Sequence, residues 1–336
     1  MKPILRKALL VIACSSLAMA DGDPLRSWRV AFVRDGNIWV CNGDGTDPKL
    51  IIEDGQSPAW SPDKSQIAFA RRGNIWRAMA DGSRQRPVTS QWAASDALQF
   101  SDVTISWRPS NGSITFSHAE AFRVERTTGA AAIAPDRNAA EGVISGSSIF
   151  DVRPAGTEPA RATVRYDLFA KGTSFNFADQ SHPAWSPSGK KLAFTRNGDI
   201  WLVEAESAPA GEPPTGWVAR RVAAVARYDE PANRGSRSNR GATRLSWHPD
   251  ERRLVYGYDR LQGSGFNEVH LLDTQTGKDS TLVKDALEPC VSPDGNFILY
   301  RSYGDACGPD GFCVIAASFD GKTRVKILSK ATQPVW

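Results

Sequence analysis

The sequence has few of the residues that most often carry chemistry. Among its 336 residues are five Cys, four His and three Met. It contains no Gly-x-Ser-x-Gly nucleophile elbow, no His-Glu-x-x-His zinc motif, no Walker loop and no Gly-x-Gly-x-x-Gly that opens a helix. The enzyme classes that depend on these motifs are therefore excluded. We assign no catalytic residue, no metal ligand and no cofactor from the sequence.

Strong charge and long apolar runs are also lacking. The 41 Lys and Arg against 37 Asp and Glu give a formal net charge of +4. Proteins dedicated to nucleic acid usually carry a pronounced basic excess, so we do not expect a nucleic-acid partner. Beyond the N-terminus, no apolar run approaches the roughly 20 residues that a membrane-spanning helix needs. The sequence therefore predicts a protein that is not transmembrane.

The first 20 residues have the layout of a Sec-type signal peptide. Lys2, Arg6 and Lys7 form a basic start, residues 8–14 are apolar, and residues 18–20 read Ala-Met-Ala, a typical cleavage site. Cleavage would remove three basic residues and no acidic one, leaving 41 − 3 = 38 basic against 37 acidic residues. We therefore expect a nearly neutral mature chain in the periplasm or outside the cell.

A second processing route stays open. Residues 11–16 read Val-Ile-Ala-Cys-Ser-Ser, which is similar to a bacterial lipobox. In that case Cys14 would carry a lipid anchor and the protein would be an outer-membrane lipoprotein.

Four cysteines remain after residue 20. Cys307 and Cys313 bracket a short loop rich in Gly, Pro and Asp, and an exported chain meets an oxidising compartment, so we expect a disulfide between them. Cys41 and Cys290 either pair with each other or are buried as small apolar residues. No Cys-x-x-Cys pair is present, and no His lies close to these cysteines in sequence, so a metal site is not expected.

One segment recurs along the chain. It is clearest at 57–76 (SPAWSPDKSQIAFARRGNIW) and at 182–201 (HPAWSPSGKKLAFTRNGDIW). Weaker copies occupy 104–116, 244–258 and 288–303. The two clearest copies each contain a short strand that ends in Trp, a Pro turn, a β-branched or aromatic strand, an Arg/Gly/Asn turn and a third strand with Ile-Trp. With a further Asp-Gly turn and a fourth strand, each unit is a four-stranded meander.

Evenly spaced short strands with periodic aromatic and turn signals are typical of a β-propeller. The Trp that ends the first strand recurs in a column, in which Val replaces Trp once: Trp60, Trp107, Trp185, Trp247, Val291 and Trp336. Six anchors predict an all-β, six-bladed propeller that forms one domain over 21–336. The longest intervals, 126–180 and 204–243, are expected to be insertions. A seventh, degenerate blade within the longest interval is the alternative.

The two ends of the chain predict how the ring closes. The first unit begins partway, at 29–40, without an opening strand. The last residues, 331–336 (ATQPVW), supply an opening strand without the rest of a unit. Pairing the two closes the ring through blade one and leaves no sheet edge open there.

These motifs carry a resemblance to a known family. The segments PAWSPD (58–63), GNIW (73–76) and PCVSPDGNFILY (289–300) resemble the WD40-like Pro-Asp (PD40) repeat of TolB-like β-propellers. The resemblance covers nearly the whole mature chain. It implies an exported six-bladed propeller that binds proteins. TolB carries an α/β domain before its propeller, whereas here the strand pattern begins at Trp28. The chain also has no room for the hydrolase domain of related peptidases.

The repeat places one polar residue per blade around the propeller axis. The residue three positions before the Trp column is polar in every copy: Ser57, Thr104, His182, Arg244, Glu288 and Gln333. The next column is apolar or Pro throughout. Because opening strands line the axial channel, we expect a ring of donors and acceptors that could bind a small polar ligand. A hydrated channel mouth is the alternative.

A second candidate site lies in the turns after the second strands. These turns carry Arg34, Arg71, Arg72, Arg196 and Arg260. Arg is a good anchor for carboxylates and is enriched in interfaces, so this face could bind a partner. A solvated rim is the alternative.

The leading hypothesis is a monomeric, non-catalytic module that binds a protein or another cell-envelope component. The alternative is a carbohydrate-active enzyme, similar to a lyase, that would use His182, Arg244 and Glu288 in the axial channel.

Overall fold

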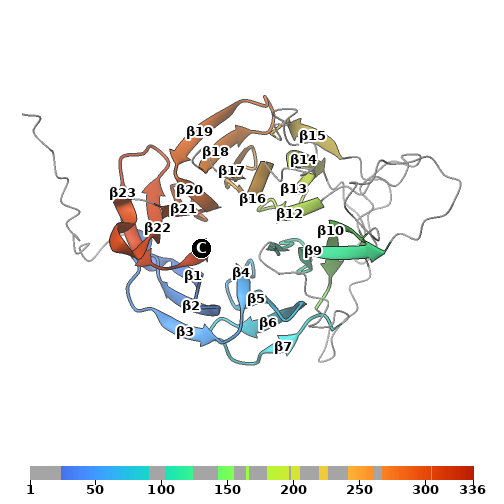
Figure 1. Ribbon diagram of the computed structural model, residues 1–336, viewed down its shortest axis with the longest axis horizontal. Coiled ribbons are helices and arrows are strands. Elements are labelled where there is room, and N and C mark those ends of the chain that lie inside the picture. The colour runs from blue at the N-terminus through green and yellow to red at the C-terminus, as the bar shows by residue number, and fades with distance from the viewer. Residues whose placement is uncertain are drawn as a thin grey trace, which may run out of the picture.

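The computed structural model describes residues 24–90, 103–123, 143–154, 164–165, 180–196, 198–204, 219–225, 241–259, 267–303 and 305–336. They form six antiparallel, four-stranded sheets that stand as blades around a central axis (Figure 1). The predicted six-bladed propeller is confirmed. Among the described residues, no helix is both long and apolar enough to cross a membrane.

The first three blades contain the strands that follow, each written from the axis outward. Blade one is β24 (Thr332–Val335), β1 (Arg29–Arg34), β2 (Asn37–Asn42) and β3 (Lys49–Ile52). Blade two is β4 (Gln56–Trp60), β5 (Gln66–Arg71), β6 (Asn74–Met79) and β7 (Arg86–Pro87). Blade three is β8 (Ile105–Trp107), β9 (Ile114–Arg123), β10 (Val143–Val152) and β11 (Val164–Arg165).

The other three blades repeat this order. Blade four is β12 (Gln180–Trp185), β13 (Lys191–Arg196), β14 (Asp199–Glu204) and β15 (Arg220–Ala223). Blade five is β16 (Gly241–Trp247), β17 (Arg253–Asp259), β18 (Glu268–Asp273) and β19 (Asp279–Lys284). Blade six is β20 (Ala286–Val291), β21 (Phe297–Tyr303), β22 (Phe312–Ser318) and β23 (Arg324–Ser329). Two short 3-10 segments, η1 (Pro24–Ser27) and η5 (Asp305–Asp310), accompany blades one and six.

The second strand of a blade is apolar on both faces because each face packs against a neighbouring blade. In β5, Ile67 and Phe69 lie in a cluster with blade one, whereas Ala68 and Ala70 lie in a cluster with blade three. All four side chains are buried. The continuous apolar run of these strands therefore comes from their position between two sheets.

The ring closes through blade one, as the two ends of the sequence predict. β24 pairs with β1, with Ala31 opposite Val335. The Trp336 indole donates to the Cys290 carbonyl of blade six at 3.2 Å, and Lys64 Nζ of blade two donates to the Trp336 carbonyl at 2.7 Å. The closing strand thus contacts the blades on both of its sides.

The Trp column joins successive inner strands. The indole N–H groups of Trp107 and Trp247 donate to the carbonyls of Ala59 and Ala184, at 3.0 and 2.9 Å. In each case the acceptor belongs to the preceding blade. The repeated Trp is therefore a link between blades as well as a core side chain.

Blade three differs from the expected insertion over 126–180. This interval contains β10 and β11, the third and fourth strands of that blade. β10 reads VISGSSIFDV and has no Ile-Trp pair, so the repeat signal is absent although the strand forms. Its ten register pairs with β9 explain why it forms without that signal. In the interval 204–243, β15 is likewise the fourth strand of blade four.

The expected disulfide is present. Cys307 and Cys313 are bonded, with Cα atoms 5.2 Å apart, and both are buried. Cys41 and Cys290 are free thiols that pack in the same apolar cluster as Trp336. Cys14 and the predicted signal peptide, 1–20, lie outside the described residues.

Candidate functional site

The antiparallel strands place the turns of the propeller on two opposite faces. Each inner strand begins near the turn between the second and third strands of the preceding blade: Gly55 N–H donates to the Gly36 carbonyl at 3.0 Å. The Pro turn after each inner strand lies at the opposite end. The start of the inner strands and the Arg-bearing turns therefore share one face, which we call the mouth face.

The six predicted axial residues form a ring, and their backbone is unusual. Five of them have left-handed φ values: Ser57 (52°), His182 (52°), Arg244 (45°), Glu288 (55°) and Gln333 (52°). None of these is glycine, and left-handed φ costs a non-glycine residue of order 1 kcal/mol or more. A β-bulge lies at the axial residue of four inner strands. There the pairing register with the second strand of the blade shifts in β4, β12, β16 and β20.

Hydrogen bonds run around the ring from blade to blade. Glu288 Oε2 accepts from the Gln333 backbone N–H at 2.6 Å. Gln333 Oε1 accepts in turn from the Ser57 backbone N–H, also at 2.6 Å. On the other side of the ring, Thr104 Oγ1 lies 2.9 Å from His182 Nδ1. Side chains of Glu and Gln are long enough to reach the next blade, so in this half of the ring each side chain binds the backbone of its neighbour.

This series of bonds from side chain to neighbouring backbone ends at Ser57. The Ser57 side chain is too short to continue it, and its buried Oγ has no hydrogen-bond partner among the residues that the structure describes. The Thr104 N–H is bound within its own blade instead, by Ser117 Oγ at 3.2 Å. The ring is therefore asymmetric, with one half closed by Glu288 and Gln333.

The electrostatics of the ring follow from burial. Burial, assisted by the positive charge of Arg244, lowers the pKa of His182 to about 3. The imidazole is therefore neutral at physiological pH. Glu288 Oε1 lies 3.4 Å from Arg301 Nη1 of the adjacent strand β21. Sequence reasoning missed Arg301, because only the register of β20 against β21 brings it to Glu288.

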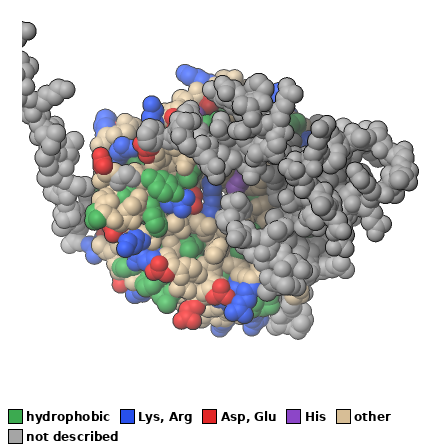
Figure 2. Space-filling model, viewed as in Figure 1, with side chains coloured by type: hydrophobic (Ala, Val, Ile, Leu, Met, Phe, Trp, Pro, Cys, Tyr) green, Lys and Arg blue, Asp and Glu red, His purple; other side chains and the backbone are tan. Residues whose placement is uncertain are grey.

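The ring opens where its charged members lie. Ser57, Thr104, His182 and Gln333 are buried, whereas Arg244 and Glu288 are half-buried. In the view along the axis, basic, acidic and histidine side chains are visible together near the middle of the molecule (Figure 2). The more exposed members of the ring are thus Arg244 and Glu288, and 14% of the Glu288 side chain is exposed.

The predicted partner-binding arginines make regular contacts within the propeller. Three guanidinium carbons lie over the Trp of the third strand of the same blade: Arg34 5.6 Å from the Trp39 ring, Arg71 4.9 Å from Trp76 and Arg196 5.5 Å from Trp201. Arg71 also donates to the Asp54 carbonyl at 2.8 Å, and Arg34 to the Ser329 carbonyl at 3.0 Å. These contacts stabilise the turns and orient the guanidinium groups.

Arg72 differs from these three. Its side chain is 75% exposed and pairs with Asp54 at 2.9 Å, so it remains accessible on the mouth face. Arg260 lies outside the described residues. A role in partner binding stays a prediction for the whole set.

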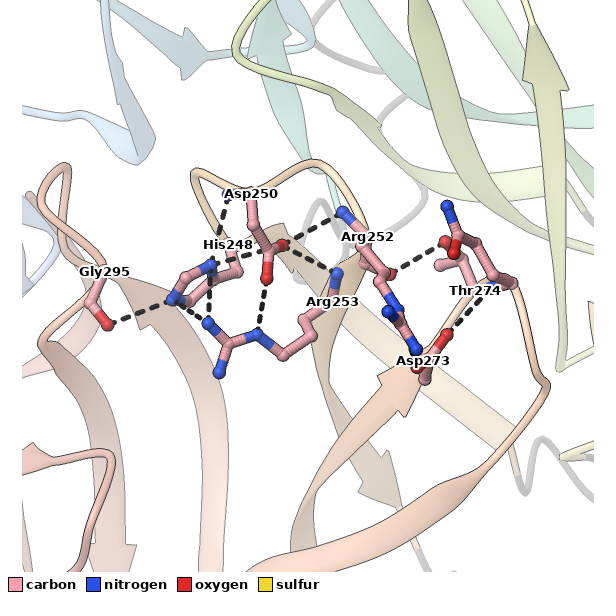
Figure 3. A network of polar contacts seen from close by, with 8 residues as sticks. His248, Asp250, Arg252, Arg253, Asp273, Thr274 and Gly295 are labelled. Carbon is pink, nitrogen blue, oxygen red and sulfur yellow. Dashed lines mark hydrogen bonds and ion pairs between the residues drawn. The ribbon is translucent and has the colours of Figure 1, made fainter.

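His248 lies in the Pro turn of blade five, at the end away from the mouth face. Its Nε2 lies 3.1 Å from the Gly295 carbonyl of blade six, and its Nδ1 lies 3.2 Å from the Asp250 N–H (Figure 3). The Arg253 guanidinium lies beside the same ring and binds Asp250 Oδ2 at 2.6 Å. Phe319 packs edge-on against the imidazole at 5.4 Å. This network joins two blades, and we assign it a structural role.

Metal ligation finds no support in this geometry. Within the part of the chain that the structure describes, no group of three or more His, Cys, Asp or Glu side chains is placed to hold a metal ion. Nδ1 of His182 is hydrogen-bonded to Thr104. The two other histidines with described side chains, His248 and His270, lie in separate hydrogen-bond networks of blade five.

Solved structures with the same architecture can now be compared. TolB from Acinetobacter baumannii superposes with a TM-score of 0.59 at 18% identity, over 93% of this chain and 67% of that one. A protein assigned as TolB from Agrobacterium tumefaciens gives 0.51 at 15% identity, over 89% and 87%. The chain has the fold of a TolB-like propeller.

The same fold extends to other proteins. A chain of the nidogen/laminin complex matches this TolB-like propeller with a TM-score of 0.54 at 12% identity, over 91% of this chain and 97% of that one. Comparison of the sequence with protein-family models and with curated proteins finds no match. The similarity is therefore one of fold.

Proposed function

We propose that this TolB-like propeller is an exported, non-catalytic binding module, and that it holds a polar segment of a protein or another envelope component at its axial mouth. The observation that carries the proposal is the ring of five left-handed, non-glycine residues. Such backbone strain persists where the surrounding structure fixes it, and it clusters at functional sites. A rigid ring on a closed scaffold is preorganised for binding.

The mouth offers a defined set of contacts. Arg244 supplies a fixed positive charge and a planar fork of donors that suits a carboxylate. Glu288 follows it in the ring; Gln333 N–H and Arg301 each bind one of its oxygens, and each oxygen keeps a second lone pair that could accept from a basic or amide group. A segment carrying both kinds of group, such as a polar stretch of polypeptide, would complement this pair.

Export is supported by two features. The predicted signal peptide over 1–20 directs the chain out of the cytoplasm, and the disulfide between Cys307 and Cys313 suits an oxidising compartment. We propose a periplasmic location. Anchoring through Cys14 is the alternative, and cell fractionation with labelled fatty acid would distinguish the two.

The lyase alternative finds less support in the ring. A histidine whose pKa is about 3 is a weak base at neutral pH, and its Nδ1 is already bound to Thr104. Both Glu288 oxygens have partners, Gln333 N–H and Arg301. We therefore propose binding rather than catalysis for these residues.

Site-specific crosslinking in the native envelope tests the proposal. A photo-crosslinking residue at position 287, next to Glu288, should give a discrete adduct, whereas one at Lys322, in an Asp-Gly turn of the opposite face, should not. Arg244→Gln should reduce the adduct from position 287 at least tenfold while the melting temperature stays unchanged. A third probe at Arg72 tests the Arg-bearing rim.

The crosslinking results at the three positions distinguish the axial mouth from the Arg-bearing rim. An adduct from Arg72 alone would overturn the axial assignment and favour the rim. Equal adducts from position 287 and Lys322, or an adduct that survives Arg244→Gln, would also overturn it.

A further inference from the structure

Blade six differs from blades one and two where its second strand reaches the mouth face. In blades one and two, the second and third strands are joined by the short turns 35–36 and 72–73. In blade six the same connection is longer and contains η5. The disulfide joins Cys307 of η5 to Cys313 of β22, and Lys326 Nζ of β23 donates to the Cys307 carbonyl at 2.9 Å. η5 is therefore tied to the third and fourth strands of its own blade.

Tyr303 ends β21, just before η5, and presents an exposed aromatic ring. It is 37% exposed, and among the residues that the structure describes Leu50 is the other exposed large hydrophobic residue. Leu50 lies on β3, the outermost strand of blade one. The Tyr303 N–H instead donates, at 3.2 Å, to the carbonyl of Asp285, the residue before the inner strand β20. Of these two side chains, Tyr303 is therefore the one that lies beside the axial mouth.

Arg301 connects Tyr303 to the polar ring at the axis. Its guanidinium carbon lies 5.1 Å from the centroid of the Tyr303 ring, and its Nη1 lies 3.4 Å from Glu288 Oε1. Arg301 pairs with Leu287, the residue before Glu288, across β20 and β21. One side chain thus contacts both the axial carboxylate and the exposed ring. A group that binds Glu288 therefore lies within a side-chain length of Tyr303.

The register of β21 explains why this contact occurs in blade six. In blades one, two and four, the residue before the axial residue pairs with Val33, Ala70 and Thr195, and the next residue of each second strand is the arginine that lies over a tryptophan. In blade six these two positions hold Arg301 and Ser302. Because successive side chains of a strand point to opposite faces, a shift of one residue moves the guanidinium to the other face of the sheet. The arginine of blade six therefore contacts the axial ring and the exposed tyrosine instead of a tryptophan.

We propose that the polypeptide segment held at the axial mouth continues across blade six, where one of its apolar side chains packs on Tyr303. This inference deepens the proposed function and rests on it for the segment itself. Tyr is enriched at binding hot spots because its ring is large, rigid and amphipathic. In an extended polypeptide, amide groups and side chains recur about every 3.3 Å, so one residue can donate to Glu288 while a neighbour covers Tyr303.

The surroundings of Tyr303 suit a polypeptide. A carboxylate acceptor and an aromatic ring joined by one arginine match a chain in which N–H donors alternate with apolar side chains. η5 adds exposed Ala306 and Pro309 to the same part of the mouth face. The disulfide holds this wall in place before a partner arrives, which reduces the entropy lost on binding.

Site-specific photo-crosslinking in the native envelope tests the path of the segment. A probe at Ala306 should capture the same partner as the probe at position 287, and proteinase K should digest the captured mass. A probe at Arg72, in the corresponding turn of blade two, should capture nothing. Tyr303→Ala should lower the yield of both adducts at least about tenfold, as expected for a hot-spot residue, whereas Tyr303→Phe keeps the ring and should retain them.

A matched control variant keeps the test specific. Leu50→Ala removes the other exposed large hydrophobic side chain and should leave both adducts unchanged. Because Tyr303 is exposed, Tyr303→Ala should melt close to the wild-type temperature, so that loss of the adducts reports binding and not folding.

The possible results separate this path from the proposed function. An adduct from position 287 that needs Arg244 but not Tyr303 would overturn the path across blade six and leave the proposed function standing. The absence of adducts from both position 287 and Ala306 would overturn both proposals. An adduct that resists proteinase K would identify a partner other than protein, such as a glycan, and would overturn the assignment of a polypeptide.

Discussion

His270 of blade five is held between two carboxylates. Its Nε2 lies 3.0 Å from Glu268 Oε2 and its Nδ1 lies 3.1 Å from Asp279 Oδ2. Tyr256 also donates to Asp279, at 2.9 Å. Burial alone would lower the pKa of His270, but the hydrogen bonds to Asp279 and Glu268 and their charges raise it overall. Both ring nitrogens donate only when the imidazole is protonated, so this cluster favours the imidazolium form.

Stability should therefore depend on pH through His270. A group whose pKa is raised on folding contributes stability fully below its unfolded value, about 6.5, and that contribution is lost as the pH rises through the folded value. We expect the wild-type melting temperature to fall between pH 6 and pH 9 more steeply than that of His270→Gln. Parallel pH dependences in the two proteins would contradict this assignment.

The positions of the axial side chains could be predicted from the repeat alone, since a fixed offset from Trp places one in each blade. Their contacts could not. Ser57 and Gln333 are joined by a hydrogen bond across 276 positions of sequence, and the left-handed φ of both residues has no signal in residue type. The neutral state of His182 likewise depends on burial by neighbouring blades.

Among the strands, the inner ones are joined by indole hydrogen bonds, but not uniformly. Trp107 Nε1 donates to the Ala59 carbonyl, whereas the buried Trp60 Nε1 has no hydrogen-bond partner in the described part of the chain. Both side chains are nearly completely buried. The Trp column could be predicted from sequence, but which of its members are bonded depends on the geometry of each blade interface.

These two tryptophans make a matched pair. Trp→Phe removes the same volume at either site, but only Trp107→Phe leaves the Ala59 carbonyl without its donor. We expect Trp107→Phe to lower the free energy of unfolding by about 1 kcal/mol more than Trp60→Phe, the net value of a typical hydrogen bond. Denaturant unfolding of both variants measures the difference. Equal losses would show that the indole bond contributes nothing.

Blade three marks the limit of prediction from the repeat. β10 forms over Val143–Val152 without the Ile-Trp pair that marks the third strand of blades one, two and four, and has Ile149-Phe150 in its place. Long register pairing with β9 replaces that local signal, and such pairing is visible only in three dimensions. The interval therefore had the sequence pattern of an insertion although it contains two strands of a blade.

For the molecule as a whole, we expect ring closure to contribute strongly to stability. β24 supplies the innermost strand of blade one, and Trp336 is buried against blade six. Deletion of residues 331–336 should open the ring and expose the inner edge of β1. Removal of a buried Trp alone typically costs about 3–5 kcal/mol. We therefore expect a clear fall in melting temperature.

Calorimetry of the deletion variant tests this, with Trp336→Phe as the control. The control keeps the strand but loses the bond to the Cys290 carbonyl and part of the buried indole volume, so we expect a loss clearly smaller than that of the deletion. A deletion as mild as the control would mean that the ring is held without its closing strand.

The pairing of β1 with β24 in blade one also sets an order of folding steps. Its sheet combines residues 29–34 with residues 332–335, which are synthesised about 300 positions later. Until β24 is in place, β1 presents an unpaired inner edge. Closure of the ring is therefore a late step relative to the synthesis of β1, in which one four-residue strand turns an open arc into a ring.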